Sequence, residues 1–113
     1  MLEEQIKICN QYGSDFVESS TNLIIGISVS VKDGVLPVHG LRIVPDNGTC
    51  GWFIWAGDYS EDPDFFKPLH AIHLNDWCPW IFKYLGLAPG FRFLVTRDYE
   101  DVWRDETLVS PRR

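Results

Sequence analysis

One stretch, which runs from Gly51 to Gly57, constrains the fold more than any other part of the chain. Five consecutive apolar residues lie between these two glycines, and most of them are aromatic or β-branched. This pattern predicts a short strand that is buried on both faces. Such a strand lies inside a sheet, so the rest of the chain must pack around it.

Hydrophobic periodicity predicts two helices. Apolar and charged residues alternate at helical spacing over residues 2–11, and Gly13 supplies the left-handed stop that often ends a helix. A second helix is expected to begin at Asn75 or Cys78 and to continue through Leu85, because its apolar residues recur at three- and four-residue intervals.

Further strands are expected on either side of the central one. Residues 23–31 alternate apolar and small side chains, which predicts the clearest strand in the chain. Residues 35–44 look extended, but Pro37 and Gly40 within them predict an edge strand or a bulge. The turn at residues 45–48 makes residues 41–57 a hairpin, and two more strands are expected at residues 91–96 and 99–104.

These elements predict one small α+β domain over residues 1–113, with a mainly antiparallel sheet of about four to six strands and two helices packed on it. The polar segment that ends at Arg113 is expected to be a tail. A long connection follows the central strand, and its Tyr59, Phe65 and Phe66 are expected to pin it to the body of the fold.

Composition favours an acidic binding protein over a nucleic-acid-binding one. Sixteen acidic and ten basic residues give a net charge of −6, which repels phosphate backbones and anionic lipids. The same charge either favours encounter with a basic protein or only keeps a small protein soluble. The acidic N-terminus lacks the features of a signal peptide and no stretch is long enough to span a membrane, so a cytoplasmic protein is expected. The three cysteines show no metal or disulfide spacing and are expected to be buried free thiols.

Signals for catalysis are weak. His70 and His73, with Asp76 and Cys78 behind them, could share a helix face and approach a metal, which leaves open a small hydrolase or metal enzyme. No glycine-rich phosphate loop is present, and no cofactor is expected. The carboxylates of residues 58–64 either cap turns and face solvent or bind a partner.

Five segments occur together in an order typical of one family. They are GWFIWAG from Gly51, DPDFFKPLH from Asp62, CP from Cys78, YLGLAPGFRFL from Tyr84 and YEDVWRDE from Tyr99. On these motifs, the chain resembles over residues 24–108 the bacterial immunity-type proteins grouped around immunity family thirty-three. The resemblance implies a small α+β domain that is encoded beside a polymorphic or contact-dependent toxin and blocks it by binding, with no catalytic residues.

The expected interface combines the central strand with the acidic connection. It consists of Trp55, Asp58, Tyr59, Glu61, Asp62 and Asp64, joined by Glu100 and Asp101. We expect these residues to cover a basic active-site or substrate groove on the toxin, for example that of a nuclease. The alternative is a housekeeping binding or scaffold module with an unknown ligand. The oligomeric state cannot be read from the sequence.

Overall fold

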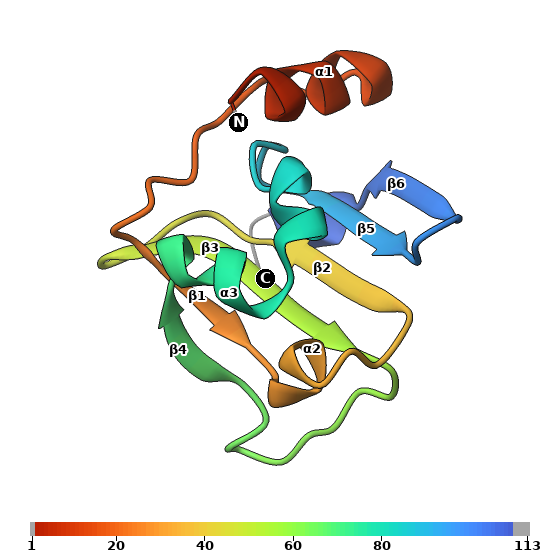
Figure 1. Cartoon of the computed structure of the whole chain (residues 1–113). Coiled ribbons are helices and arrows are strands. Elements are labelled where there is room, and N and C mark those ends of the chain that lie inside the picture. The colour runs from red at the N-terminus through yellow and green to blue at the C-terminus, as the bar shows by residue number, and fades with distance from the viewer. Residues whose placement is uncertain (1, 110–113) are drawn as a thin grey trace.

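A six-stranded mixed sheet forms the centre of the molecule (Figure 1). The computed structural model describes residues 2–109. The strands are β1 Ile24–Ile27, β2 Val38–Arg42, β3 Thr49–Ala56, β4 Lys67–His70, β5 Phe91–Val95 and β6 Glu100–Arg104. Their order across the sheet is β4-β1-β3-β2-β5-β6, and only the pair of β1 and β3 is parallel. The predicted α+β class and mainly antiparallel sheet are confirmed.

Strand β3 lies inside the sheet between β1 and β2, as its apolar sequence predicts. Trp52 and Ile54 point towards the helices and are at most 1% exposed. Trp55 points to the opposite face and is still buried, whereas Phe53 beside it is only half-buried. The turn between β2 and β3 is also where the sequence predicts it, so this hairpin is confirmed.

Helical segments cover one face of the sheet. The α-helices are α1 Leu2–Tyr12, α2 Val29–Lys32 and α3 Leu74–Trp77, and short 3-10 helices occur at η1 Ala71–His73, η2 Pro79–Tyr84 and η3 Glu106–Leu108. Figure 1 shows α3 in front of the sheet and α1 beyond the end of it. Helix α1 is tied to η2 by the Gln5 amide, which donates a 3.0 Å hydrogen bond to the carbonyl of Phe82. The face of the sheet opposite α3 and η2 is called the outer face below.

Both predicted helices are present, but the second one is divided. Helix α1 ends at the predicted place, and Gly13 follows it with φ +72°. The segment after residue 73 forms α3 and then η2, with an extended residue, Cys78, between them at φ −161°. Pro79 explains the break, because proline lacks an N–H and disfavours helical geometry at the residue before it.

The strand predicted over residues 23–31 is wrong in its second half. Strand β1 ends at Ile27, and the next residues turn into α2. The Ser28 hydroxyl accepts a hydrogen bond from the Ser30 amide at 3.3 Å, and the Ser30 hydroxyl accepts one from the Ala56 amide at 3.1 Å. Serine side chains that bond to backbone in this way compete with the sheet ladder, so Val29 leaves the sheet and is 56% exposed.

The prediction of an edge strand at residues 35–44 is also wrong. Strand β2 is an interior strand that pairs with both β3 and β5. Pro37 precedes the strand, so it removes no hydrogen bond from the ladder. Gly40 leaves room for the ring of Phe93, since a Cβ atom there would lie 2.3 Å from a ring carbon. The glycine therefore marks close packing inside the sheet.

Arg42 joins the sheet to the segments around it. Its side chain is 1% exposed. Its Nε donates to the carbonyl of Cys50 at 2.8 Å, and its Nη1 donates to the carbonyls of Val17 and Leu87, both at 2.7 Å. Its guanidinium also lies 5.7 Å from the ring centroid of Trp52. The buried charge is thus satisfied by backbone dipoles.

The remaining expectations concern the cysteines, membranes and the tail. All three cysteines are buried and free, as predicted. No helix in residues 2–109 has the length and apolar character needed to cross a bilayer. The end of the polar tail predicted at the C-terminus lies outside the described residues.

Candidate functional site

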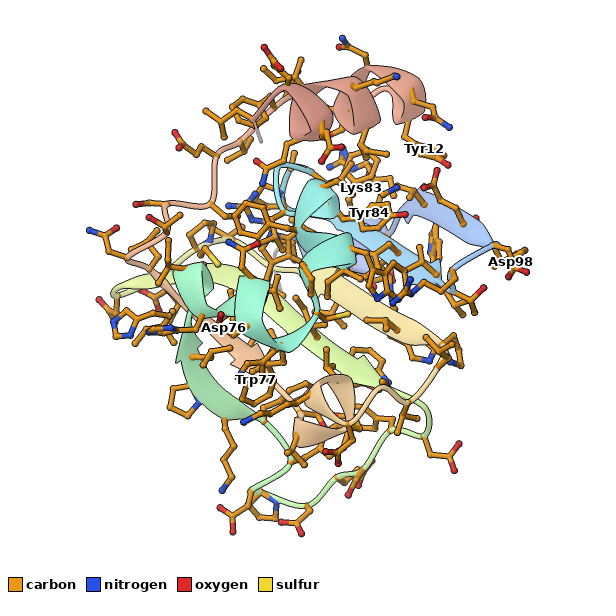
Figure 2. All side chains as sticks on the ribbon, in the orientation of Figure 1. Tyr12, Asp76, Trp77, Lys83, Tyr84 and Asp98 are labelled. Carbon is orange, nitrogen blue, oxygen red and sulfur yellow. The ribbon has the colours of Figure 1, made fainter. Side chains whose placement is uncertain are left out.

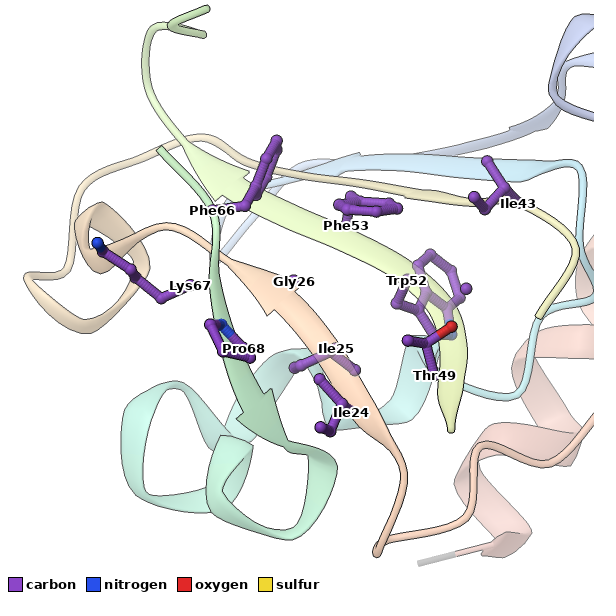
Figure 3. Close-up of a pocket in the computed structure, with 11 residues that line it drawn as sticks. Ile24, Ile25, Gly26, Ile43, Thr49, Trp52, Phe53, Phe66, Lys67 and Pro68 are labelled. Carbon is purple, nitrogen blue, oxygen red and sulfur yellow. The ribbon is translucent and has the colours of Figure 1, made fainter. Parts of the chain in front are cut away.

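The outer face of the sheet carries apolar side chains from neighbouring strands. Side chains of a strand alternate between faces, so the pairs His39 with Trp55 and Leu41 with Phe53 share this face. Figure 3 shows Phe53 and Ile43 on the side of the sheet away from the helices, with Phe66 beside them. The part of this face over β3 and the neighbouring end of β2 is therefore largely apolar, and Arg92 on β5 lies on the same face opposite Leu41.

Phe53 lies across the neighbouring strand β1. It is in register with Gly26, and a Cβ atom on Gly26 would lie 2.8 Å from the phenyl ring. A larger residue at this position would displace the ring. Gly26 thus supports the surface by leaving space for Phe53, a role that its place in an alternating strand did not indicate.

Trp55 organises the rings around it. His39 stacks on it with a centroid distance of 5.0 Å and an interplanar angle of 11°. Tyr59 and Phe66 meet it edge to face at 5.4 Å and 6.0 Å. Burial, with a contribution from the charge of Arg92, lowers the pKa of His39, so the imidazole stacked on Trp55 is neutral at pH 7.

The acidic loop, residues 57–66, is attached to this face by its aromatic residues. Phe65 packs against Tyr59 at 5.4 Å and against Phe66 at 4.9 Å, and Phe66 packs on Phe53 at 5.2 Å. These contacts confirm that the loop is pinned to the sheet by its rings. A pinned loop presents its polar residues in a fixed arrangement.

These side chains enclose an aromatic hollow on the outer face. It has a volume of about 340 Å³ and is lined by Leu41, Ile43, Phe53, Trp55, Tyr59 and Phe66. A second hollow of about 250 Å³ continues beyond Phe53 and Phe66 over β1, where it reaches Gly26 and Pro68 (Figure 3). Tyr59 is 58% exposed, whereas Trp55 is only 6% exposed. Trp55 is therefore the floor of the hollow, and Tyr59 is the most exposed ring that lines it.

The four carboxylates predicted in the loop are all exposed. Asp62 shapes the loop, since its Oδ1 accepts a hydrogen bond from the amide of Asp64 at 2.8 Å. Asp64 lies 4.0 Å from the ammonium of Lys67, a distance at which an exposed pair contributes little. Asp58 and Glu61 have no ion-pair partner in the described part of the chain.

Glu100 lies apart from the loop, on the helix side of edge strand β6. Its carboxylate accepts hydrogen bonds from the hydroxyl of Tyr12, on α1, and from that of Tyr84, the latter at 2.6 Å (both tyrosines are labelled in Figure 2). Burial alone would raise the pKa of Glu100, but the two tyrosines and the charge of Lys83 outweigh it and hold the pKa below its usual value. Glu100 thus fastens α1 and η2 to the sheet. Asp101 beside it is exposed and pairs with Leu94, on the outer face.

His70 and His73 are exposed and belong to no group of three potential metal ligands in the described part of the chain. The rings of His70 and His73 are 6.4 Å apart, and His73 lies 3.8 Å from Asp76 on the surface. No cluster of three potential metal ligands occurs in residues 2–109. Cys78 is separate from them and buried, and burial raises the pKa of its thiol. This geometry gives no support to the metal-enzyme alternative.

Sequence reasoning missed four residues of the aromatic hollow: Leu41, Ile43, Phe53 and Phe66. The sequence pattern predicts an edge strand for the first two, and an edge strand does not indicate a broad apolar face. It predicts a core position for Phe53 and only an anchoring role for Phe66. The available signal was the pair of outward-facing rings on β3 beside an apolar row on β2.

Comparison with known proteins gives one finding. No curated protein and no solved structure matches the chain. The model of the Imm33-like domain family matches residues 4–105, which is nearly the whole chain and includes every strand of the sheet. This range confirms the resemblance drawn from the ordered motifs. The chain therefore belongs to the Imm33-like domain family, a family of immunity proteins.

Proposed function

We propose that this chain neutralises a basic bacterial toxin by binding it with the aromatic hollow and the acidic loop, without a catalytic step. The observation that carries the proposal is an exposed aromatic hollow beside four unburied carboxylates, in a chain of an immunity family. Aromatic anchors in a pocket supply most of the binding energy of many interfaces, and complementary charge accelerates encounter.

The proposed contact surface keeps most of the residues expected from sequence. Trp55 supports it from below, Tyr59 supplies an exposed ring, and Asp101 marks its far edge on β6. The carboxylates are those of Asp58, Glu61, Asp62 and Asp64. Glu100 is left out of the surface, because Tyr12 and Tyr84 already occupy both oxygens of its carboxylate.

The charge of the chain supports the proposal that the toxin is basic. A net charge of −6, with an acidic loop beside the hollow, complements a basic groove and not an acidic one. Enzymes that act on nucleic acids have such grooves, because they must bind phosphate. Inhibition then follows from occupying the groove, and the rigid interior strand β3 holds the inhibitory surface in place.

The test begins with the partner. The tagged chain is used to capture proteins from its own organism, and a captured protein is then expressed in a susceptible bacterium with and without this chain. We expect a stoichiometric complex and restored growth when both proteins are present. A captured protein whose toxicity is unchanged by this chain would contradict the proposal.

The contribution of the loop is tested with matched charge changes. Replacing Asp58→Asn, Glu61→Gln and Asp64→Asn removes three charges beside the hollow, and the control Glu3→Gln, Glu4→Gln and Glu18→Gln removes three exposed charges elsewhere. Because steering depends on local charge, the loop variant is expected to associate about tenfold more slowly at low salt. Equal rates for the two variants would show that the loop has no special part in binding.

A further inference from the structure

The tryptophan at the floor of the aromatic hollow lacks a cation that the other tryptophans of the chain have. The cation-to-centroid distances are 5.4 Å for Lys32 and Trp77, 5.7 Å for Arg42 and Trp52, 5.7 Å for Arg92 and Trp103, and 5.2 Å for Arg97 and Trp80. Trp55 has no such partner among residues 2–109, and the side chain stacked on it is the neutral His39. The hollow is thus an aromatic site without an internal cation.

The carboxylates of the acidic loop are not balanced within the fold. Residues 58–67 contain four acids and one base, Lys67, which leaves a net charge of −3. That single base lies near Asp64, at the end of the loop away from Asp58. Arg92, whose charge acts on His39, lies opposite Leu41 on the neighbouring strand, but it is held by Asp105 at 3.1 Å and covers Trp103. The region around the hollow therefore favours a cation from outside.

The dimensions of the hollow suit one long side chain. Its volume of about 340 Å³ lies at the small end of the range of about 300–1,000 Å³ for pockets that bind whole ligands. An arginine can pack its alkyl stem on Leu41 and Ile43 and stack its planar, weakly hydrated guanidinium on a ring such as Tyr59. Lysine fits less well, because its ammonium is compact and strongly hydrated.

We propose that the aromatic hollow receives an arginine side chain of the toxin, with the guanidinium on the rings of Tyr59 and Phe66 and facing the unpaired carboxylates of the acidic loop. This inference rests on the proposed function and names the chemistry of the partner at that site. The arginine is the anchor of the interface, and the carboxylates select it over a neutral side chain of similar shape.

The first experiment needs no toxin. The ¹⁵N-labelled chain is titrated with the peptide acetyl-Gly-Arg-Gly-amide and followed by NMR, with a citrulline peptide of the same shape but no charge as the comparison. We expect the indole resonance of Trp55 and the amides of Tyr59 and Phe66 to shift, and the citrulline peptide to bind about fivefold more weakly, as the loss of one cation–π contact predicts.

Two tyrosines of similar exposure provide a matched pair of variants. Tyr59→Leu keeps the hollow apolar but removes its exposed ring, while Tyr99→Leu changes a residue near β6 that is 55% exposed, against 58% for Tyr59. We expect Tyr59→Leu to reduce the preference for arginine over citrulline, because one cation–π contact is lost while Phe66 and the carboxylates remain, and Tyr99→Leu to retain the full preference. Equal binding of the two peptides to the unaltered chain, or shifts confined to other parts of the surface, would overturn the proposal.

Other occupants appear as distinct outcomes. If the same resonances move with protein concentration alone, the hollow is an interface between copies of this chain. The chain also ends in Arg112 and Arg113, so a version that lacks residues 110–113 is titrated in parallel. If only the shortened chain bound the arginine peptide, residues 110–113 would be the segment that occupies the hollow and blocks the peptide. Either result would overturn the assignment to a toxin.

The peptide result and the capture result separate the two proposals. If the hollow selects arginine but no toxin is captured and neutralised, the proposed function fails and the arginine site stands. If a toxin is neutralised but the hollow shows no preference for arginine, the proposed function stands and this inference fails.

Discussion

Replacing Arg42→Met should remove a large part of the stability of this domain. Arg42 is 1% exposed and donates short hydrogen bonds to three backbone carbonyls, those of Cys50, Val17 and Leu87. These carbonyls belong to β3, to the segment after α1 and to the segment before β5. A methionine fills a similar volume but donates no hydrogen bond to any of them.

The size of the effect follows from the groups left without a donor. A buried acceptor that loses its partner costs about 1–3 kcal/mol, and relief from burying the guanidinium charge offsets part of that cost. Three carbonyls at about 1–1.5 kcal/mol each give a net loss of about 3–4.5 kcal/mol. Domains of this size have a free energy of unfolding of about 5–15 kcal/mol, so much of it would be lost.

Equilibrium unfolding in urea, monitored by tryptophan fluorescence, measures this loss directly. Arg42→Lys is expected to be destabilised almost as much, because one ammonium cannot reproduce the fork of donors. The control is Arg104→Met, an exposed arginine 3.5 Å from Glu106, which should change stability by less than about 0.5 kcal/mol. If the free energy of unfolding of Arg42→Met were within about 1 kcal/mol of that of the unaltered chain, the reasoning would be refuted. Such a result would mean that the cost of burying the charge offsets the stabilisation from its hydrogen bonds.

Two further predictions concern stability. Gly40→Ala should destabilise the sheet by about 1–3 kcal/mol, because the new Cβ would meet the Phe93 ring. The loss should be smaller in a Phe93→Leu background, and an equal loss in both would contradict this account. The pKa of Glu100 in the folded chain is below its ordinary value of 4.5. Its contribution to the free energy of unfolding is therefore present above pH 4.5 and is lost as the pH falls through the folded pKa. Burial and the Glu100 carboxylate raise the pKa of Tyr12 from 10.0 to about 12. The contribution of Tyr12 to the free energy of unfolding is therefore present below pH 10 and is lost as the pH rises towards 12. The free energy of unfolding, measured in urea across pH, should fall at both acidic and alkaline pH, and Glu100→Gln should reduce both losses. Losses of the same size in the variant would contradict the assignment.

Local sequence patterns predict those elements whose structure depends mainly on residues that are close in sequence. Helix α1 follows from its periodicity and the glycine after it, and β3 follows from its apolar run. The loop rings also behave as predicted, because Tyr59 and Phe66 had to bury some surface in a loop that carries so many charges. These features need no knowledge of distant parts of the chain.

The errors arise where a distant group decides the outcome. The residues after Ile27 alternate like a strand, but Ser30 is bound by the amide of Ala56 and the chain turns away. Gly40 resembles a strand breaker, yet the ring of Phe93 on another strand uses its space. Local propensity cannot contain such information, because the partner is tens of residues away.

The candidate site shows the same division. Composition and the ordered motifs identify an acidic, aromatic α+β domain of the immunity type, and they point to Trp55 and Tyr59, which line the hollow. That these residues and the loop carboxylates bind a partner stays a prediction. Tertiary structure decided the rest. It placed β2 inside the sheet between β3 and β5, made Trp55 the floor of a hollow, and placed Glu100 against Tyr12 and Tyr84. Sequence determines which side chains are available, but only the packing of distant strands determines which of them share a surface, because long-range contacts form through space.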